Sequence, residues 1–254
     1  MHINSLVKDS ILQIQIARPE KKNALTIDMY KEMTKALKEA SDNSKIRVVI
    51  LYGHPDIFCS GNDLQDFMSG IESKEEIAAI DFLKVLSSFP KPIIAAVAGP
   101  AIGIGTTMLL HCDLIYAASN CRFQLPFVNL ALVPEAASSL ILPARIGYQR
   151  AAELLLLGEV FSAERAFEYG LINEITDVGR ELTVATERAI KLATKPPAAI
   201  RLTKMLLKQS SLEAVHQRID DEAGHFSHRL KSPEAAEAFK AFYEKRAPDF
   251  SKFN

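Results

Sequence analysis

The sequence predicts an α/β fold in which strand–helix units come first and helices dominate the last part of the chain. In the first half, short apolar runs alternate with segments whose apolar residues recur every three or four positions. Such runs are typical of buried strands, and the longer period is typical of amphipathic helices. In the second half the helical period dominates. The 254 residues, 48% of them hydrophobic, suffice for one sizeable core.

The first half begins with an expected strand at 11–16, where apolar and polar residues alternate. An amphipathic helix follows from Thr26, which we expect to be its N-cap. Ser73 and Glu76 have the spacing of a capping box before another helix. The remaining elements expected in this half are strands at 48–51, 92–97 and 114–117 and a helix at 104–112.

The second half has a helical pattern in most of its length. Ser232 and Pro233 mark one helix start, because serine caps helices and proline is tolerated in the first turn. The break Lys195-Pro196-Pro197 predicts a boundary between a core region, 1–195, and a C-terminal helical region, 196–254. The expected helices are 149–157, 163–169, 183–193, 198–209, 212–230 and 233–245.

Charge, cysteine content and hydropathy exclude several classes of protein. A balance of 30 basic and 31 acidic residues gives no support for a nucleic-acid partner. Three cysteines are too few for a disulfide scaffold and suit a reducing compartment, so we expect a cytoplasmic location. The first six residues lack the pattern of a secretory signal. The apolar stretch 92–118 contains His111, Asp113 and several glycines and prolines, so we expect no membrane partner.

Two glycine turns follow expected buried strands. The turn at 99–105 has the strand–helix context of a dinucleotide fingerprint, but Met108 stands where the third glycine belongs. It is either a tight structural turn or a close backbone approach to a ligand at a helix N-terminus. The turn at 58–64 leaves the same two alternatives, with Asp63 as a possible cap of a short helix. We expect Cys59 to be a small buried apolar residue rather than a nucleophile.

Other chemistry-bearing residues leave simpler alternatives open. Glu135 stands among small apolar residues, so it is either a surface carboxylate or a buried general base with a raised pKa. Asp221, Glu222, His225 and His228 share a helix face, but without a matching partner helix we expect a solvated polar face and no metal site. His111 lies in an apolar helix, where we expect a hydrogen-bonded core histidine.

Taken together and in order, these motifs resemble the crotonase, or enoyl-CoA hydratase/isomerase, family. The resemblance implies a crotonase-like spiral of ββα units over 1–195 and a C-terminal helical trimerisation region over 196–254. It also implies a homotrimer or a dimer of trimers. The segments that carry the resemblance are 17–25, 58–64, 91–103, 112–117, 163–172 and 238–246.

The family binds acyl-CoA thioesters and stabilises an enolate, which implies an acyl-CoA partner for this chain. By motif position, the oxyanion hole would be the backbone N–H groups of Asn62 and Ile104. The resemblance implies no cofactor, because coenzyme A is part of the substrate. The residues that the resemblance assigns to substrate and coenzyme A binding are Lys22, Asn23, Ala24, Ser60, Gly61, Asn62, Asp63, Leu64, Gly103 and Phe127.

Departures from the family pattern indicate the reaction. The two glutamates that hydratases of the family use fall on Thr107 and Phe127, whereas Glu135 stands where several isomerases carry their one acid. The local sequence is similar to peroxisomal-type Δ3,Δ2-enoyl-CoA isomerases, which implies an isomerase of fatty-acid β-oxidation with Glu135 as catalytic residue. The alternatives are a hydratase, a ring-epoxide or phenylacetyl-type CoA isomerase, or a catalytically silent acyl-CoA-binding relative. We expect the acyl pocket to lie between 66–89 and the C-terminal helices.

Overall fold

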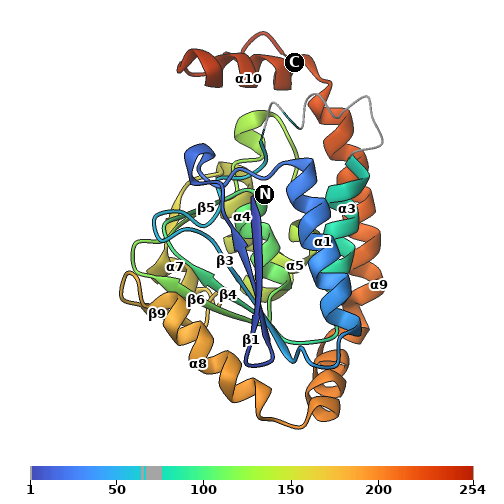
Figure 1. Cartoon of the computed structure of the whole chain (residues 1–254). Helices are drawn as coiled ribbons and strands as arrows, with labels where there is room; N and C mark the ends of the chain where they lie inside the picture. The colour runs from blue at the N-terminus through green and yellow to red at the C-terminus, as the bar shows by residue number, and fades with distance from the viewer. Residues whose placement is uncertain (1, 64–65, 67–75, 254) are drawn as a thin grey trace.

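The computed structural model describes residues 2–63, 66 and 76–253 (Figure 1). Its main sheet has six strands in the order β1-β2-β3-β4-β6-β9, and a smaller sheet has the order β5-β7-β8. In the main sheet β1 and β2 pair antiparallel, and the other neighbours pair in parallel. The strands are β1 (Ile3–Lys8), β2 (Ile11–Ile16), β3 (Val48–Tyr52), β4 (Ile93–Val97), β5 (Pro100–Ile102), β6 (Leu114–Ala118), β7 (Arg122–Gln124), β8 (Phe161–Ser162) and β9 (Glu174–Thr176).

Helices cover both faces of the main sheet. On one side α1 packs against α3 and α3 against α9, while α8 covers β3, β4 and β6 from the other side (Figure 1). The longer helices are α1 (Ile27–Asp42), α3 (Glu76–Ser88), α5 (Ser138–Ile146), α8 (Glu181–Ala193), α9 (Pro197–Leu230) and α10 (Pro233–Glu244). The short helices and turns are η1 (Pro19–Lys21), α4 (Ile104–Thr107), η2 (Met108–His111), η3 (Val128–Leu130), α6 (Tyr148–Ala152), η4 (Glu153–Leu157) and α7 (Ala163–Glu168).

Several predicted elements are confirmed with their local causes. The expected strands at 11–16, 48–51, 92–97 and 114–117 are β2, β3, β4 and β6, and every residue of β4 is buried. The Thr26 hydroxyl accepts the Met29 N–H at 3.3 Å and so caps α1. Ser232 caps α10 in the same way, accepting the Ala235 N–H at 3.1 Å. We expected a capping box at 73–76. Its residues before Glu76 lie outside those that the structure describes.

Other elements differ from the prediction. The two helices expected at 198–209 and 212–230 are one helix, α9, in which the Ser211 hydroxyl donates to the Lys208 carbonyl at 3.2 Å. This local bond satisfies the serine without ending the helix. The helix expected at 104–112 is a short α4 followed by the 3₁₀ turn η2. Strands β1, β5, β7, β8 and β9 and helix α5 were not predicted.

The C-terminal helices position one wall of the candidate site. Helix α9 begins at Pro197, directly after the expected boundary, and α10 lies across the upper end of the molecule (Figure 1). The division into regions 1–195 and 196–254 stays a prediction. Within the described residues, no helix is both long and apolar enough to span a membrane. Cys59, Cys112 and Cys121 are buried free thiols.

Candidate active site

The turn before α4 leaves a backbone donor unused. Gly103 has φ 57° and ψ −120°, a conformation that L-residues with a side chain rarely adopt. Ile104 is the first residue of α4, where helix geometry provides no intrahelical acceptor for the N–H group. Within the described part of the chain no other acceptor takes this N–H. The Gly103 conformation therefore aims a free helix N-terminus at the space in front of it.

A second turn brings Asn62 to the same space. Gly61 has φ 104°, and Asn62 forms an isolated parallel bridge with Leu25. Beside it, Asp63 forms an ion pair of 2.7 Å with Arg18, and both side chains are largely buried. Asp63 also accepts the Asp66 N–H at 3.2 Å, as expected for a helix cap. Among the described residues the Asn62 N–H has no protein acceptor, so it is a second unused donor.

Both donors border a large cleft of about 740 Å³. The C-terminal helices contribute apolar and aromatic residues to its wall, including Phe226, Phe239 and Phe242. Most of the residues predicted to bind coenzyme A are among those that line it. These are Lys22, Ala24, Ser60, Gly61, Asn62, Asp63, Gly103 and Phe127, together with Ile104.

Two of the predicted binding residues are not part of this lining. Asn23 is fully buried, and its side chain accepts the Arg18 N–H and donates to the Ile57 and Phe58 carbonyls at 2.8–3.1 Å. Since Asn23 has φ 54°, these bonds hold a left-handed turn rather than a ligand. The Asn23 side chain is thus engaged within the protein, and a contact of this residue with coenzyme A stays a prediction. Leu64 lies outside the described residues.

Glu135 lies in a smaller chamber of about 50 Å³ that adjoins the cleft. Asn62 and Phe226 line both spaces, so the carboxylate and one backbone donor face a connected hollow. Among the described residues that line the chamber, Glu135 is the one ionisable side chain. The others are Asn62, Ala79, Ile80, Leu83, Ala136, Ile219, Ala223, Phe226 and Ser227.

The surroundings of Glu135 favour its protonated form. Burial raises the pKa of Glu135 from 4.5 to about 8, and the charge of Glu222 adds to the rise. A hydrogen bond from Thr107 Oγ1 to Glu135 Oε1, 2.5 Å long, opposes it. Glu135 is half-buried and lines the chamber, which favours the carboxylate with a raised pKa over the surface carboxylate.

Thr107 and Tyr30 were not identified from the sequence as residues that contact the site. Thr107 was considered only as a missing acid, yet it holds Glu135. Tyr30 donates its hydroxyl to Asn62 Oδ1 at 2.5 Å, and burial, followed by the charge of Glu135, raises its pKa well above 10. Its position on the buried face of α1 is a usable signal, because a buried tyrosine hydroxyl needs a partner.

Glu222 corrects the prediction of a solvated polar face at 221–228. It is 5% exposed and follows Val215 and Ile219 on the buried stripe of α9. A carboxylate at a helical position otherwise filled by apolar residues is the signal that could have identified it. Among the described residues, no group of three or more histidines, cysteines or acids is arranged to hold a metal.

His111 and Cys59 are structural, as expected. Burial lowers the pKa of His111 to about 3, and its Nε2 lies 2.8 Å from the Ala136 carbonyl oxygen. The neutral ring therefore donates this hydrogen bond. Cys59 is fully buried, and burial raises the pKa of its thiol to about 12. Neither side chain is suited to nucleophilic or acid–base chemistry at neutral pH.

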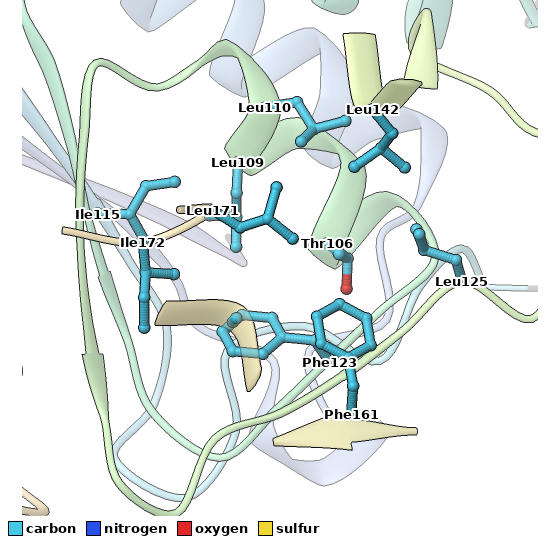
Figure 2. Close-up of a pocket in the computed structure, with 11 residues that line it drawn as sticks. Thr106, Leu109, Leu110, Ile115, Phe123, Leu125, Leu142, Phe161, Leu171 and Ile172 are labelled. Atoms are coloured by element: carbon cyan, nitrogen blue, oxygen red, sulfur yellow. The ribbon is translucent and has the colours of Figure 1, made fainter. Parts of the chain in front are cut away.

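A third cavity lies in the core and is unrelated to the site. Figure 2 shows that leucine, isoleucine and phenylalanine side chains surround it, with Thr106 as its one labelled hydroxyl. That hydroxyl already donates to the Ala101 carbonyl at 2.5 Å. The cavity measures about 20 Å³ and offers no further polar partner, so we regard it as a packing void.

Known proteins resemble this chain over almost its whole length. Residues 7–253 match the enoyl-CoA hydratase/isomerase family. The chain belongs to this family. Enoyl-CoA delta isomerase 2 from Rattus norvegicus is 35% identical over 93% of this chain, which spans 62% of the rat protein. 1,2-epoxyphenylacetyl-CoA isomerase from Escherichia coli is 30% identical over 98% of both chains.

Solved structures agree with the fold prediction. Enoyl-CoA hydratase/isomerase from Pseudoalteromonas atlantica superimposes with a TM-score of 0.94 and 37% identity over 98% of this chain and 100% of that one. OdaA from Pseudomonas aeruginosa gives a TM-score of 0.92 and 44% identity over 95% and 98%. The predicted crotonase-like α/β fold with a C-terminal helical region is confirmed.

Proposed function

We propose that this member of the enoyl-CoA hydratase/isomerase family is a Δ3,Δ2-enoyl-CoA isomerase of fatty-acid β-oxidation. It would move a double bond from C3 to C2 of an acyl-CoA with Glu135 as its one catalytic acid and base. The observation that carries the proposal is the lone carboxylate in an apolar chamber shared with Asn62. The resemblance to rat and human proteins named enoyl-CoA delta isomerase 2 supports it.

In the proposed reaction the thioester oxygen accepts hydrogen bonds from the N–H groups of Asn62 and Ile104. Negative charge grows on this oxygen as the C2 proton leaves, so fixed donors stabilise the transition state more than the ground state. The pantetheine and nucleotide part of the substrate would lie in the large cleft beside Lys22 and Ser60. Binding and chemistry thus use two connected spaces.

Glu135 moves the proton. Its carboxylate takes a proton from C2, and the electron pair of that C–H bond enters a dienolate extending from the thioester oxygen to C4. The protonated Glu135 then delivers the same proton to C4, which leaves the double bond between C2 and C3. Because Thr107 engages Oε1 and no described residue donates to Oε2, we assign the transfer to Oε2.

The surroundings of Glu135 suit both steps. A carboxyl group with a pKa of about 8 accepts and releases a proton near neutral pH. Thr107 and Phe127 supply no second carboxylate, so water addition lacks its usual acid–base pair. The isomerisation involves no net redox change, and the proposal needs no metal, flavin or nicotinamide.

A different isomerase reaction is the second candidate. The Escherichia coli protein named 1,2-epoxyphenylacetyl-CoA isomerase matches this chain over nearly the full length of both. Proteins named hydratases also match, among them 2,3-dehydroadipyl-CoA hydratase at 30% identity. A silent acyl-CoA-binding protein would retain the cleft but exchange no proton at C2.

One set of assays tests these alternatives. Purified protein is incubated with 3-enoyl-CoA, 2-enoyl-CoA and 1,2-epoxyphenylacetyl-CoA, and products and C2 deuterium exchange are measured. We expect conversion of 3-enoyl-CoA and its loss in Glu135→Gln, with acyl-CoA binding retained. Full turnover by Glu135→Gln would contradict the role of Glu135. Binding without turnover or exchange in the unmodified protein would favour the silent alternative.

We also propose that copies of the chain assemble into a homotrimer or a dimer of trimers. Leu202, Leu206 and Leu207 on α9 are 53–77% exposed in the isolated chain, which supports their burial by another copy. Light scattering coupled to gel filtration tests this, and a monomeric mass would contradict it.

The buried free thiols support the proposed cytoplasmic location. Fractionation of cells that produce the protein tests the location, and a recovery in organelles would contradict it.

A further inference from the structure

The turn that carries Glu135 has a strained backbone. Ala136 and Ala137 have φ 61° and 56°, and for alanine each such left-handed residue costs roughly 1–2 kcal/mol. Glycine would avoid this cost, but the chain has alanine at both positions. Contacts from elsewhere in the fold must therefore hold the turn in this conformation.

Two distant side chains hold it. Glu222 on α9 accepts the Ala137 N–H at 2.6 Å with Oε2 and the Ser139 N–H at 3.0 Å with Oε1. These N–H groups belong to the N-terminus of α5, where no local side chain provides a cap. His111 of η2 donates to the Ala136 carbonyl at 2.8 Å. The C=O and the N–H of the peptide group between Ala136 and Ala137 are thus both hydrogen-bonded.

Charge accompanies these contacts. The charge of Glu135 reaches Tyr30 of α1 and Cys59, and Arg218 of α9 lowers the pKa of Glu222. Tyr30 and Cys59 stay protonated at neutral pH because burial raises the pKa of each. The described chamber residues of α3 are uncharged, and His111 is neutral. Repulsion from Glu222 is the electrostatic contribution that raises the pKa of Glu135.

We propose that Glu222 is a positioning residue for Glu135. Its carboxylate holds the strained turn through the N–H groups of Ala137 and Ser139, and so determines where the Glu135 side chain enters the chamber. The proposal rests on the proposed function in taking Glu135 as the acid and base. Glu222 itself is not among the residues that line the cleft or the chamber, so it acts through the turn.

The kinetic test compares Glu222→Gln with Asp221→Asn. The glutamine side chain has one carbonyl oxygen, which can accept from only one of the Ala137 and Ser139 N–H groups at its position. Its NH2 group would then face the other N–H, and two donors cannot form a hydrogen bond. We expect kcat with 3-enoyl-CoA to fall roughly 100-fold, as for a displacement of about 1 Å, with KM nearly unchanged. Asp221 is the neighbouring exposed carboxylate on α9, and Asp221→Asn should leave kcat unchanged.

The pH profile separates positioning from a merely structural role. The rising limb of kcat/KM should follow the pKa of Glu135, and Glu222→Gln should move it to lower pH because repulsion is lost. Glu222→Asp keeps the charge but reaches less far, so kcat should fall while the limb stays near its original pH. An unchanged limb in Glu222→Gln, or an equal shift in Asp221→Asn, would overturn the proposal.

A second pair of variants tests the contact from the α5 side. Ser139→Pro removes the N–H that Glu222 Oε1 accepts, in the first helical turn where proline is tolerated. Ser139→Ala keeps the N–H. The hydroxyl that Ser139→Ala removes bonds Glu222 and accepts from Arg218, so we expect kcat to fall further in Ser139→Pro than in Ser139→Ala, and equal behaviour of the two would contradict the proposal. If Glu222→Gln does not fold, these two variants still test whether the contact between Glu222 and the turn positions Glu135.

A stability measurement keeps the proposal independent of turnover. The folded-state pKa of Glu135 is raised, so its contribution to the free energy of unfolding declines as pH rises from 4.5 to about 8. Comparing each protein with its Glu135→Gln counterpart isolates this decline. In the Glu222→Gln background it should end at lower pH. If the end of this decline moves to lower pH but the protein shows no turnover, only the proposed isomerase function is contradicted. If the protein turns over 3-enoyl-CoA but the decline does not move, the proposed interaction between Glu222 and Glu135 is contradicted.

Discussion

The donor side and the carboxylate side of the site are held by different means. Ile104 and Asn62 present their N–H groups from turns whose geometry depends on adjacent glycines, Gly103 and Gly61. Glu135 stands on a turn of two left-handed alanines that are held by His111 and Glu222. The donor turns thus obtain their positive φ from glycine, although Leu25 and Tyr30 also contact Asn62, whereas the alanine turn beside Glu135 depends for its positive φ on contacts from distant elements.

This difference has consequences for evolution and for mutation. A glycine turn keeps its shape when remote residues change, because its conformation costs little. The alanine turn depends on contacts from η2 and α9, so changes far away in the sequence reach Glu135. Substitutions on the two sides should consequently alter different kinetic quantities.

After Glu135→Gln, the largest expected effect comes from removing one backbone donor. Ile104→Pro deletes the N–H at the first position of α4, where proline fits the helix. We expect kcat to fall about 10²- to 10³-fold, the usual cost of losing one oxyanion donor. Ile104→Val keeps the N–H and should stay near the original kcat. Similar kinetics for the two variants would show that the donor side does not bind the thioester oxygen.

A smaller effect is expected from Thr107→Val on the carboxylate side. Losing the hydroxyl removes a hydrogen bond that lowers the pKa of Glu135, so this pKa should rise above its value of about 8. The rising limb of kcat/KM should move to higher pH by about one to two units. Thr107→Ser retains the hydroxyl as a control. A shift to lower pH, the direction expected for Glu222→Gln, would contradict the assigned role of Thr107.

The smallest effect is expected at the rim of the cleft. Lys22 is exposed and lines the cleft away from the chamber, so Lys22→Ala should raise KM for acyl-CoA about two- to fivefold without changing kcat. The difference should diminish at high salt. Lys8→Ala, an exposed lysine outside the cleft lining, is the matched control. A fall in kcat for Lys22→Ala would contradict the separation of binding from chemistry.

Much of the fold could be predicted because burial leaves a periodic pattern. The continuous apolar runs of β3 and β4 and the stripe of α1 are visible in the sequence. The two- and three-residue strands β5, β7, β8 and β9 are too short to show a period. The length of α9 was also missed, since Ser210 and Ser211 resemble a break, and only the structure shows that the Ser211 hydroxyl bonds the Lys208 carbonyl within one helix.

By itself, the sequence determined the α/β class, the glycine turns before Asn62 and Ile104, and the presence of an acid at Glu135 among apolar neighbours. Each of these depends on residues close together in the chain. The tertiary structure alone decided that Asn23 turns inward, that Tyr30 and Thr107 contact the site residues, and that Glu222 supports the turn from 85 residues away. Partners so distant in sequence meet only when burial of the apolar helix faces brings α1, α4, α5 and α9 together around one chamber.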